Sequence, residues 1–252
     1  MSDLKILLFD IETSMLKAYT YGLFKQNIPI ENIIEHPRMI AFSAKWYGKR
    51  GTKFYSEYHH SRKEMLGAMH ELLDEADVVV GWNSRRFDVK WVNSEFMAEG
   101  YTPPSPFKQI DLMAEVKRNA RWVSNKLDYV SERLLNEGKI PYSMSEMWRI
   151  VNNPDTPENV VKREWNKMRR YAIRDTNLVE PLLTKLLPWI RMPHPVRSGE
   201  GLCRACGSEN LVRRGHALTL QGRYQRYRCE DCGKWMQGTA RIPETNLREI
   251  TG

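Results

Sequence analysis

The stretch LKILLFDIE (residues 4–12) constrains the fold more than any other part of the sequence. Its two alternating sets of side chains are both mostly apolar, which predicts a strand that is covered on both faces. Such a strand lies at the centre of a sheet, with other elements packed above and below it. Asp10 and Glu12 interrupt the apolar pattern at the carboxyl end of the strand, where open sheets place their binding sites.

The patterns that follow predict a mixed α/β fold. Two strand patterns (38–48 and 52–58) are joined by GKRG, which favours a hairpin. The remaining expected elements are, in order, a helix at 61–76, a short buried strand at 77–83, a helix at 85–100, a loop at 101–109, and helices at 111–120, 125–137, 143–152 and 157–187, the last of them bent or broken. This order predicts a mixed sheet with helices on both faces.

A long insertion, residues 13–37, separates the first strand from the hairpin. A connection of that length so close to the end of a central strand usually covers a site. Its aromatic side chains Tyr19, Tyr21 and Phe24 have two possible roles. They either stack on the terminal bases of a nucleic acid or cover the edge of the sheet.

The chain is basic, with 39 Lys and Arg against 31 Asp and Glu and a net charge of +8. A pI near 9.3 favours a polyanionic partner such as nucleic acid, although a merely basic protein is the alternative. No apolar run approaches the ~18 residues of a membrane span, and the first residues lack the features of a signal peptide. We therefore expect a soluble, intracellular protein with no membrane partner.

Separate segments supply carboxylates that could meet at one site. Asp10 and Glu12 are two residues apart on a strand, so their side chains leave the same face. Asp88 follows the second buried strand, and Tyr171 stands one helical turn before Asp175. Each feature alone has an ordinary explanation: a polar strand end, a carboxylate favoured by a helix dipole, and a packed core tyrosine. For Asp175 the alternative is a solvated helix face, paired with Arg174 or Lys185.

Taken together, the segments FDIET (9–13), NSRRFD (83–88) and YAIRD (171–175) resemble the three motifs of the DnaQ-like 3′–5′ exonucleases. The tyrosine four residues before the last aspartate is similar to the DEDDy branch of that family. Within it, the chain most resembles single-domain exonucleases related to family B DNA polymerases, often encoded by phages. The resemblance spans roughly residues 4–190 and implies a ribonuclease H-like fold.

The resemblance also implies roles for these residues around two Mg²⁺ or Mn²⁺ ions, which prefer oxygen ligands. Asp10 would bridge both ions, Glu12 and Asp175 would hold the ion nearer the attacking water, and Asp88 would support the second. Tyr171 would orient the water. Asn83 and Phe87 match positions near the end of the substrate, although Asn83 could simply close a turn and Phe87 could be core. Asp111 stays outside this set, because it is expected to be the N-cap of the following helix.

The implied activity is metal-dependent 3′–5′ hydrolysis of single-stranded DNA to nucleoside 5′-monophosphates. Two alternatives stay open: a 3′–5′ exoribonuclease, and a non-catalytic protein that binds or recruits nucleic acid. A separate polymerase or replication protein is a possible partner, since proofreading would then act between two chains. The resemblance also implies a location in the cytoplasm of a bacterial or phage-infected host cell.

All four cysteines lie in two Cys-x-x-Cys-Gly segments, CRACG (203–207) and CEDCG (229–233). Four thiolates are a complete ligand set for a structural zinc, and the glycine after each pair permits a tight turn around the sulfurs. A disulfide pair is the alternative, disfavoured by a reducing compartment. The sequence therefore predicts a small zinc ribbon with one Zn²⁺ held by Cys203, Cys206, Cys229 and Cys232.

Between these pairs, residues 216–228 predict a hairpin that turns at Gln221-Gly222. Arginine and tyrosine alternate in this region, as in proteins that bind single strands, although a solvated strand pair is the alternative. The nucleic-acid contacts expected here are Arg213, Arg214, Arg223, Tyr224, Arg226, Tyr227 and Arg228. The predicted organisation is an exonuclease domain at 1–190, a linker at 191–201, the ribbon at 202–236 and a tail at 237–252 with little to bury.

Overall fold

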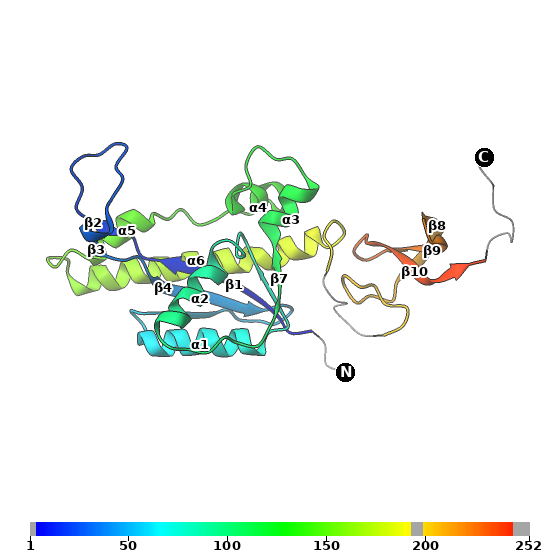
Figure 1. Cartoon of the computed structure of the whole chain (residues 1–252), viewed down its shortest axis with the longest axis horizontal. Helices are drawn as coiled ribbons and strands as arrows, with labels where there is room; N and C mark the ends of the chain where they lie inside the picture. Colours follow the sequence, from blue (N-terminus) through cyan, green and yellow to red (C-terminus); the bar gives the residue numbers. More distant parts are fainter. Residues whose placement is uncertain (1–3, 193–198, 244–252) are drawn as a thin grey trace. The chain divides into compact units, whose positions relative to one another are not determined.

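A computed structural model describes residues 4–192 and 199–243 of the chain (Figure 1). The chain divides into two compact units, one of Lys5–Leu182 and one that contains the chain from Leu183 onward. The predicted linker lies partly, and the end of the predicted tail entirely, outside the described residues. The domain limits given above stay a prediction.

The strands and helices follow the expected order closely. The strands are β1 (Ile6–Thr13), β2 (Lys17–Ala18), β3 (Ile33–Glu35), β4 (Met39–Trp46), β5 (Lys53–Ser56), β6 (Val78–Gly81), β7 (Lys108–Asp111), β8 (Leu211–Thr219), β9 (Gly222–Cys229) and β10 (Trp235–Ile242). The helices are α1 (Arg62–Glu75), α2 (Asp88–Ala98), α3 (Leu112–Asn119), α4 (Leu127–Leu135), α5 (Met144–Val151) and α6 (Glu158–Leu186), with a 3₁₀ turn at Ile30–Asn32.

The described residues of the first unit form a five-stranded sheet in the order β5-β4-β1-β6-β7. β1 is central, pairing antiparallel with β4 and parallel with β6. β5 and β7 pair with β4 and β6 and form the two edges. The predicted mixed sheet with a central first strand is therefore confirmed.

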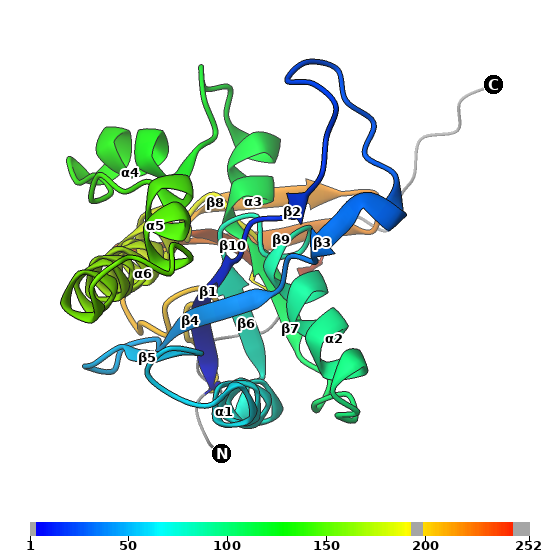
Figure 2. The same ribbon diagram turned by 90° about the vertical axis from the view of Figure 1, so that its left-hand side faces the viewer.

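Helices cover both faces of this sheet, as Figure 2 shows. On one face, Leu7, Phe9 and Ile11 of β1 belong to a buried cluster that includes apolar residues of α1 and α2. On the other face, Ile40 and Ala41 of β4 belong to a cluster with buried residues of α5 and α6. Burial on both sides explains why both alternating sets of β1 are apolar.

Two elements differ from the expectation. The segment around Lys108–Asp111 was expected to be mostly loop, but it is strand β7, parallel to β6. A four-residue strand next to three prolines carries little periodic signal, and its hydrogen bonds come from β6. The last long helix is not broken: α6 is a single helix of 29 residues with Pro181 inside it. Buried side chains on both sides of Pro181, at Val179 and Leu182, anchor the helix there.

The insertion after β1 is an arm whose base is the short β2–β3 ladder. Its aromatic side chains are exposed, with Tyr19, Tyr21 and Phe24 at 72%, 100% and 85% exposure. They therefore do not cover the edge of the sheet, which removes one of the two roles considered for them.

The second unit contains a three-stranded antiparallel sheet in the order β10-β9-β8. The predicted hairpin is present, but its loop is Leu220-Gln221 rather than Gln221-Gly222, because Gly222 already pairs with Thr219. β10 continues to Ile242, beyond the ribbon limit predicted at 236. No helix among the described residues has the length and apolar character needed to cross a bilayer.

Candidate functional site

Asp10 and Glu12 lie on the face of the sheet opposite α1 and α2. Their neighbours in the strand, Phe9 and Ile11, point into the cluster under those helices, so the alternating carboxylates point the other way. Asp10 pairs across the sheet with Ser43 of β4. A register shift follows between Glu12 and Thr13, where the regular ladder ends.

Asp88, the first residue of α2, is tied directly to β1. Its Oδ1 accepts a hydrogen bond from the Ile11 N–H at 3.1 Å, and its side chain is buried. Ile11 stands between Asp10 and Glu12, so this contact brings the third carboxylate to the other two. The helix-dipole explanation does not account for that long-range contact.

Asp175 reaches the same face of the sheet from α6. Ser43 Oγ donates to the Ala172 carbonyl at 2.8 Å and lies 2.6 Å from Thr176 Oγ1. All three residues are fully buried, and they fix the helix one residue away from Asp175. Asp175 is itself only 2% exposed, so the solvated-face alternative is wrong.

Tyr171 and Asp175 share a partner that the sequence did not indicate, Lys139. The Lys139 Nζ donates to Tyr171 Oη at 2.8 Å and forms an ion pair with Asp175. The Tyr171 ring stacks on Tyr142, with ring centroids 4.7 Å apart. Tyr171 is thus both packed, as a core tyrosine would be, and hydrogen-bonded within the acidic site.

The loop between α4 and α5 holds Lys139 in place. The Lys139 N–H donates to Asp128 at 2.8 Å. Arg174 donates to the Gly138 carbonyl at 3.1 Å and forms an ion pair with Glu137. Arg174 therefore anchors the loop rather than pairing with Asp175. No spacing in the sequence relates Lys139 to α6, so only its contacts identify it.

The carboxylates destabilise one another's charge. Burial raises the pKa of Asp10, and its acidic neighbours raise it further while Lys139 opposes the effect. Burial also raises the pKa of Glu12 to about 8, again with Asp175 adding to the increase and Lys139 opposing it. For Asp88, burial raises the pKa to about 7 against the lowering effect of the Ile11 N–H. A bound cation would favour the ionised form of all of these groups.

The oxygen donors suit hard divalent cations. Asp175 Oδ1 is buried and has no hydrogen-bond partner, which leaves an acceptor free for a ligand. Among the described residues, only the cysteine sulfurs form a set of potential ligand atoms all within 4.8 Å of one another, so the carboxylates are more widely spaced. Two ions about 4 Å apart spread their ligands over more space than one ion does.

A cavity of about 660 Å³ opens beside Asp10. Asn83, Lys117, Lys126 and Lys139 are among its lining residues, so basic side chains from around α3 and α4 face the acidic group. The volume lies within the range of small-ligand pockets. The arrangement suits a substrate that is anionic and binds through a metal.

Asn83 and Phe87, the two residues expected near the substrate, have different structural environments. Asn83 has a left-handed backbone (φ 65°), donates its N–H to Asp111 and leaves its buried Oδ1 unpartnered. It therefore closes a turn and also lines the cavity. Phe87 is 39% exposed and lies edge-on to Trp91, so it is not a core residue. Asp111 caps α3 through the Ala114 N–H, as predicted.

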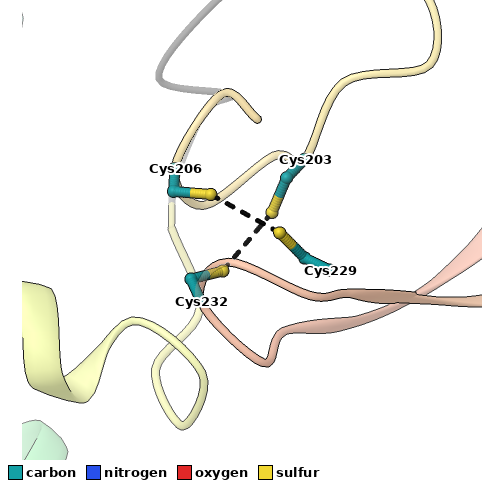
Figure 3. A group of neighbouring side chains, drawn as sticks. All are labelled: Cys203, Cys206, Cys229 and Cys232. Carbon is teal, nitrogen blue, oxygen red and sulfur yellow. Dashed lines mark hydrogen bonds between the residues drawn. The ribbon is translucent and has the colours of Figure 1, made fainter. Parts of the chain in front are cut away.

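The four cysteines come together in the second unit, as Figure 3 shows. The Cys203–Cys232 and Cys206–Cys229 sulfur distances are 3.6 and 3.7 Å. A metal with four sulfurs at 2.3 Å in a tetrahedron separates them by about 3.8 Å, whereas a disulfide bond is about 2.05 Å. The cysteines are unbridged, and their spacing fits a tetrahedral metal ion.

The glycine after each cysteine pair forms the turn that the sequence indicated. Gly207 and Gly233 both have φ 77°, and their N–H groups donate to the carbonyls of Cys203 and Cys229. The arginines and tyrosines expected to contact nucleic acid lie on β8 and β9, where Arg213, Arg214 and Arg226 are exposed and the others are partly buried.

Similarities to known proteins agree with this fold. A family model of the RNase H superfamily matches residues 7–149, more than half of the chain, and these residues include Asp10, Glu12 and Asp88. The DNA polymerase 060R of Frog virus 3 (isolate Goorha) is 26% identical over 104 residues, which are 40% of this chain and 9% of the viral protein.

The family B DNA polymerase from the hyperthermophilic archaeon Pyrobaculum calidifontis superposes with a TM-score of 0.54 at 18% identity. The match covers 74% of this chain and 25% of the archaeal one, so the chain spans only a small part of either polymerase. The shared fold and the matching family model lead to one assignment. This chain belongs to the RNase H superfamily, as the resemblance to DnaQ-like exonucleases implied.

Proposed function

We propose that the chain is a divalent-metal-dependent 3′–5′ exonuclease of the DEDDy type, acting on single-stranded DNA. The observation that carries this proposal is the meeting of carboxylates from β1, α2 and α6 beside one cavity, with Asp88 and Asp175 buried and the β1 pair partly buried. Structural roles alone do not require several mutually repelling acids at one place. A non-catalytic binding protein would have no use for them.

Each residue of the acidic site has its own role in this proposal. Asp10, Glu12, Asp88 and Asp175 would hold two Mg²⁺ or Mn²⁺ ions, which when bound activate water and stabilise the leaving oxygen. The Tyr171 hydroxyl would orient the attacking water. The ammonium of Lys139, within hydrogen-bond distance of that hydroxyl, would keep the phenol in position and offset negative charge on the substrate.

The substrate end of the site would receive the terminal nucleotide. Asn83 lines the cavity and has a buried Oδ1 without a hydrogen-bond partner, and Phe87 offers an exposed ring for stacking. Hydrolysis there would release nucleoside 5′-monophosphates. Because both similar proteins are named DNA polymerases, we favour DNA over RNA and a separate polymerase as the partner, in a bacterial or phage-infected cell.

The cysteine cluster would hold one structural Zn²⁺, and the zinc ribbon around it would bind nucleic acid. Four thiolates complete the coordination of the ion and leave no position for a substrate. The surrounding strands supply arginines and tyrosines but no acid. Their charge suits a polyanion rather than an acidic protein surface.

End-labelled oligonucleotides test the activity. The wild-type chain should shorten single-stranded DNA from its 3′ end in the presence of Mg²⁺ or Mn²⁺, and should leave it intact without added divalent ion. Matched RNA and duplex DNA in the same series decide the substrate. Faster loss of RNA would make the chain an exoribonuclease, and no cleavage of any strand would make it a non-catalytic binding protein.

Variants of the site separate chemistry from folding. Asp10→Ala and Asp175→Ala should abolish cleavage while DNA binding in the absence of turnover stays near that of the wild type. Tyr171→Phe should lower kcat by roughly tenfold or more and change KM little, because the lost hydroxyl acts on the reacting water. Full activity in both aspartate variants would eliminate the two-metal proposal.

A further inference from the structure

The strand register of the three-stranded sheet separates its arginines and tyrosines into two faces. Residues directly opposite one another in an antiparallel pair lie on the same face, and side chains alternate along each strand. Arg228 of β9 pairs with Trp235 of β10, and Tyr224 pairs with Arg241. Arg226 lies between Arg228 and Tyr224 on that same side.

We name these side chains the Trp235 face: Tyr224, Arg226, Arg228, Trp235 and Arg241. The opposite face carries side chains of the same kinds, including Arg213, Leu218, Arg223 and Tyr227, and also Cys229, whose sulfur belongs to the cysteine cluster. The composition of the sequence gives no reason to prefer one face, so the preference must come from geometry.

Contacts on the Trp235 face organise an aromatic platform. The Arg226 guanidinium lies over the indole of Trp235, 5.1 Å from the ring centroid. Arg226 Nε also donates to the carbonyl of Arg214 at 2.9 Å, at the bulge that contains Gly215. A backbone acceptor thus fixes the guanidinium that holds the ring. Trp235 nevertheless stays 49% exposed.

The cations around this ring are arranged along the sheet. Arg228 stands opposite Trp235 in the ladder, and Arg241 packs directly over Gly222, where any side chain would collide with it. β8, β9 and β10 contain no acid, and Arg228 forms an ion pair at 3.8 Å with Glu230, which follows β9. A half-exposed indole that is held in place among arginines suits a nucleic-acid strand, in which bases that can stack alternate with negatively charged phosphates.

We propose that the Trp235 face, and not the opposite face, is the surface of the ribbon that binds single-stranded nucleic acid. A base stacks on Trp235, while Arg228 and Arg241 contact the flanking phosphates. This inference rests on the nucleic-acid-binding role proposed for the ribbon and names the residues that perform it. It removes Arg213, Arg223 and Tyr227, which lie on the opposite face, from the contacts expected from the sequence. It requires a single strand, because a duplex keeps its bases stacked on one another.

Two matched pairs of variants test the inference in the full-length chain, in an Asp10→Ala background so that no substrate is cleaved. Arg228→Gln and Arg213→Gln make the same change at neighbouring register positions on opposite faces. Trp235→Ala and Leu218→Ala each remove an exposed apolar side chain, again on opposite faces. Fluorescence anisotropy with labelled oligo-dT and with a duplex of equal length measures affinity over a range of salt concentrations, and zinc content and Tm report folding.

Trp235→Ala should weaken oligo-dT binding about fivefold or more and change duplex binding little. Arg228→Gln should weaken it and reduce the salt slope by about 0.7, the contribution of one phosphate contact on a single strand. Arg213→Gln and Leu218→Ala should bind like the parent. Equal losses on both faces, losses on the opposite face alone, or no loss from any variant would each overturn the inference. Because binding is measured without turnover, the result stands apart from that of the nuclease assay.

Discussion

At the scale of single residues, the site combines buried and partly buried acids with one partly buried base. Lys139 is 26% exposed and forms an ion pair with Asp175, which is 2% exposed. Its ammonium counters the burial that raises the pKa of Asp175, and Asp175 in turn raises the pKa of Lys139 despite its own burial. Lys139 is therefore the residue on which the charge balance of the site most depends.

Lys139→Met should lower the free energy of unfolding by about 2 kcal/mol in the absence of added divalent ions. Removing one partner of a buried ion pair costs 3–5 kcal/mol, and the partial exposure of Lys139 reduces that cost. Urea unfolding followed by circular dichroism measures the change. Saturating Mg²⁺ should recover part of it, because a divalent ion supplies the missing positive charge.

The double variant Lys139→Met with Asp175→Asn is the control for this prediction. Replacing Asp175 by an uncharged amide removes the uncompensated carboxylate, so the double variant should be more stable than Lys139→Met alone. If the losses of unfolding free energy from the two substitutions instead add fully, the ion pair is not what stabilises the loop. Arg174→Lys, which should retain the charge near Glu137, serves as a second control.

At the scale of elements, the site depends on how α6 is set against β4. A helix can roll about its axis, and a roll of one residue moves a side chain by about 100°. The buried contacts of Ser43 with Ala172 and Thr176 oppose that roll. The positions of Asp175 and Tyr171 therefore depend on a pair of hydroxyl groups that takes no part in the proposed chemistry.

Ser43→Ala and Thr176→Val should each destabilise the fold by about 1–2 kcal/mol, because each leaves a buried polar partner with fewer hydrogen bonds. Together they should cost less than the sum of the two, since they share one hydrogen bond. Urea unfolding of the wild type, both single variants and the double variant gives the coupling energy. The kcat of the single variants should fall while KM changes less, and fully additive stabilities would argue against a shared contact.

At the scale of the whole molecule, the buried acids link stability to pH. The pKa of Glu12 is raised from 4.5 to about 8 and that of Asp88 from 3.8 to about 7, and burial is the largest cause of both increases. A carboxyl group whose pKa is higher in the folded state holds its proton more tightly there than in the unfolded chain. Its contribution to stability is therefore present at low pH and lost as the pH rises through the folded-state value.

The Tm measured without divalent ions should accordingly fall between about pH 6 and pH 8, and Mg²⁺ or Mn²⁺ should raise it more at pH 8 than at pH 6. The ions bind ionised oxygens, which the higher pH supplies. Differential scanning fluorimetry over this range measures both effects. In Asp88→Asn the fall should be smaller, and a metal effect that is equal at the two pH values would contradict the linkage.

Several features of the fold and of the site were determined locally, by patterns within short stretches of the sequence. The apolar run of β1 gave its central place, because a strand buried on both faces has no other position in a sheet. The two-residue spacing of Asp10 and Glu12 placed their side chains on one face of the strand. The Cys-x-x-Cys-Gly spacing determined the tight turn at each cysteine pair, because glycine tolerates the positive φ that the turn requires. Each follows from backbone geometry over a few residues.

Other features were decided only by tertiary structure, because their partners are distant in the chain. β7 exists as a strand through its pairing with β6, and α6 stays one helix across Pro181 through the burial of its neighbours. Lys139 enters the acidic site because a loop between two helices is anchored to α6. The sequence thus specified which side chains could perform the chemistry, while long-range packing decided which of them meet, since a contact energy depends on distance in space and not along the chain.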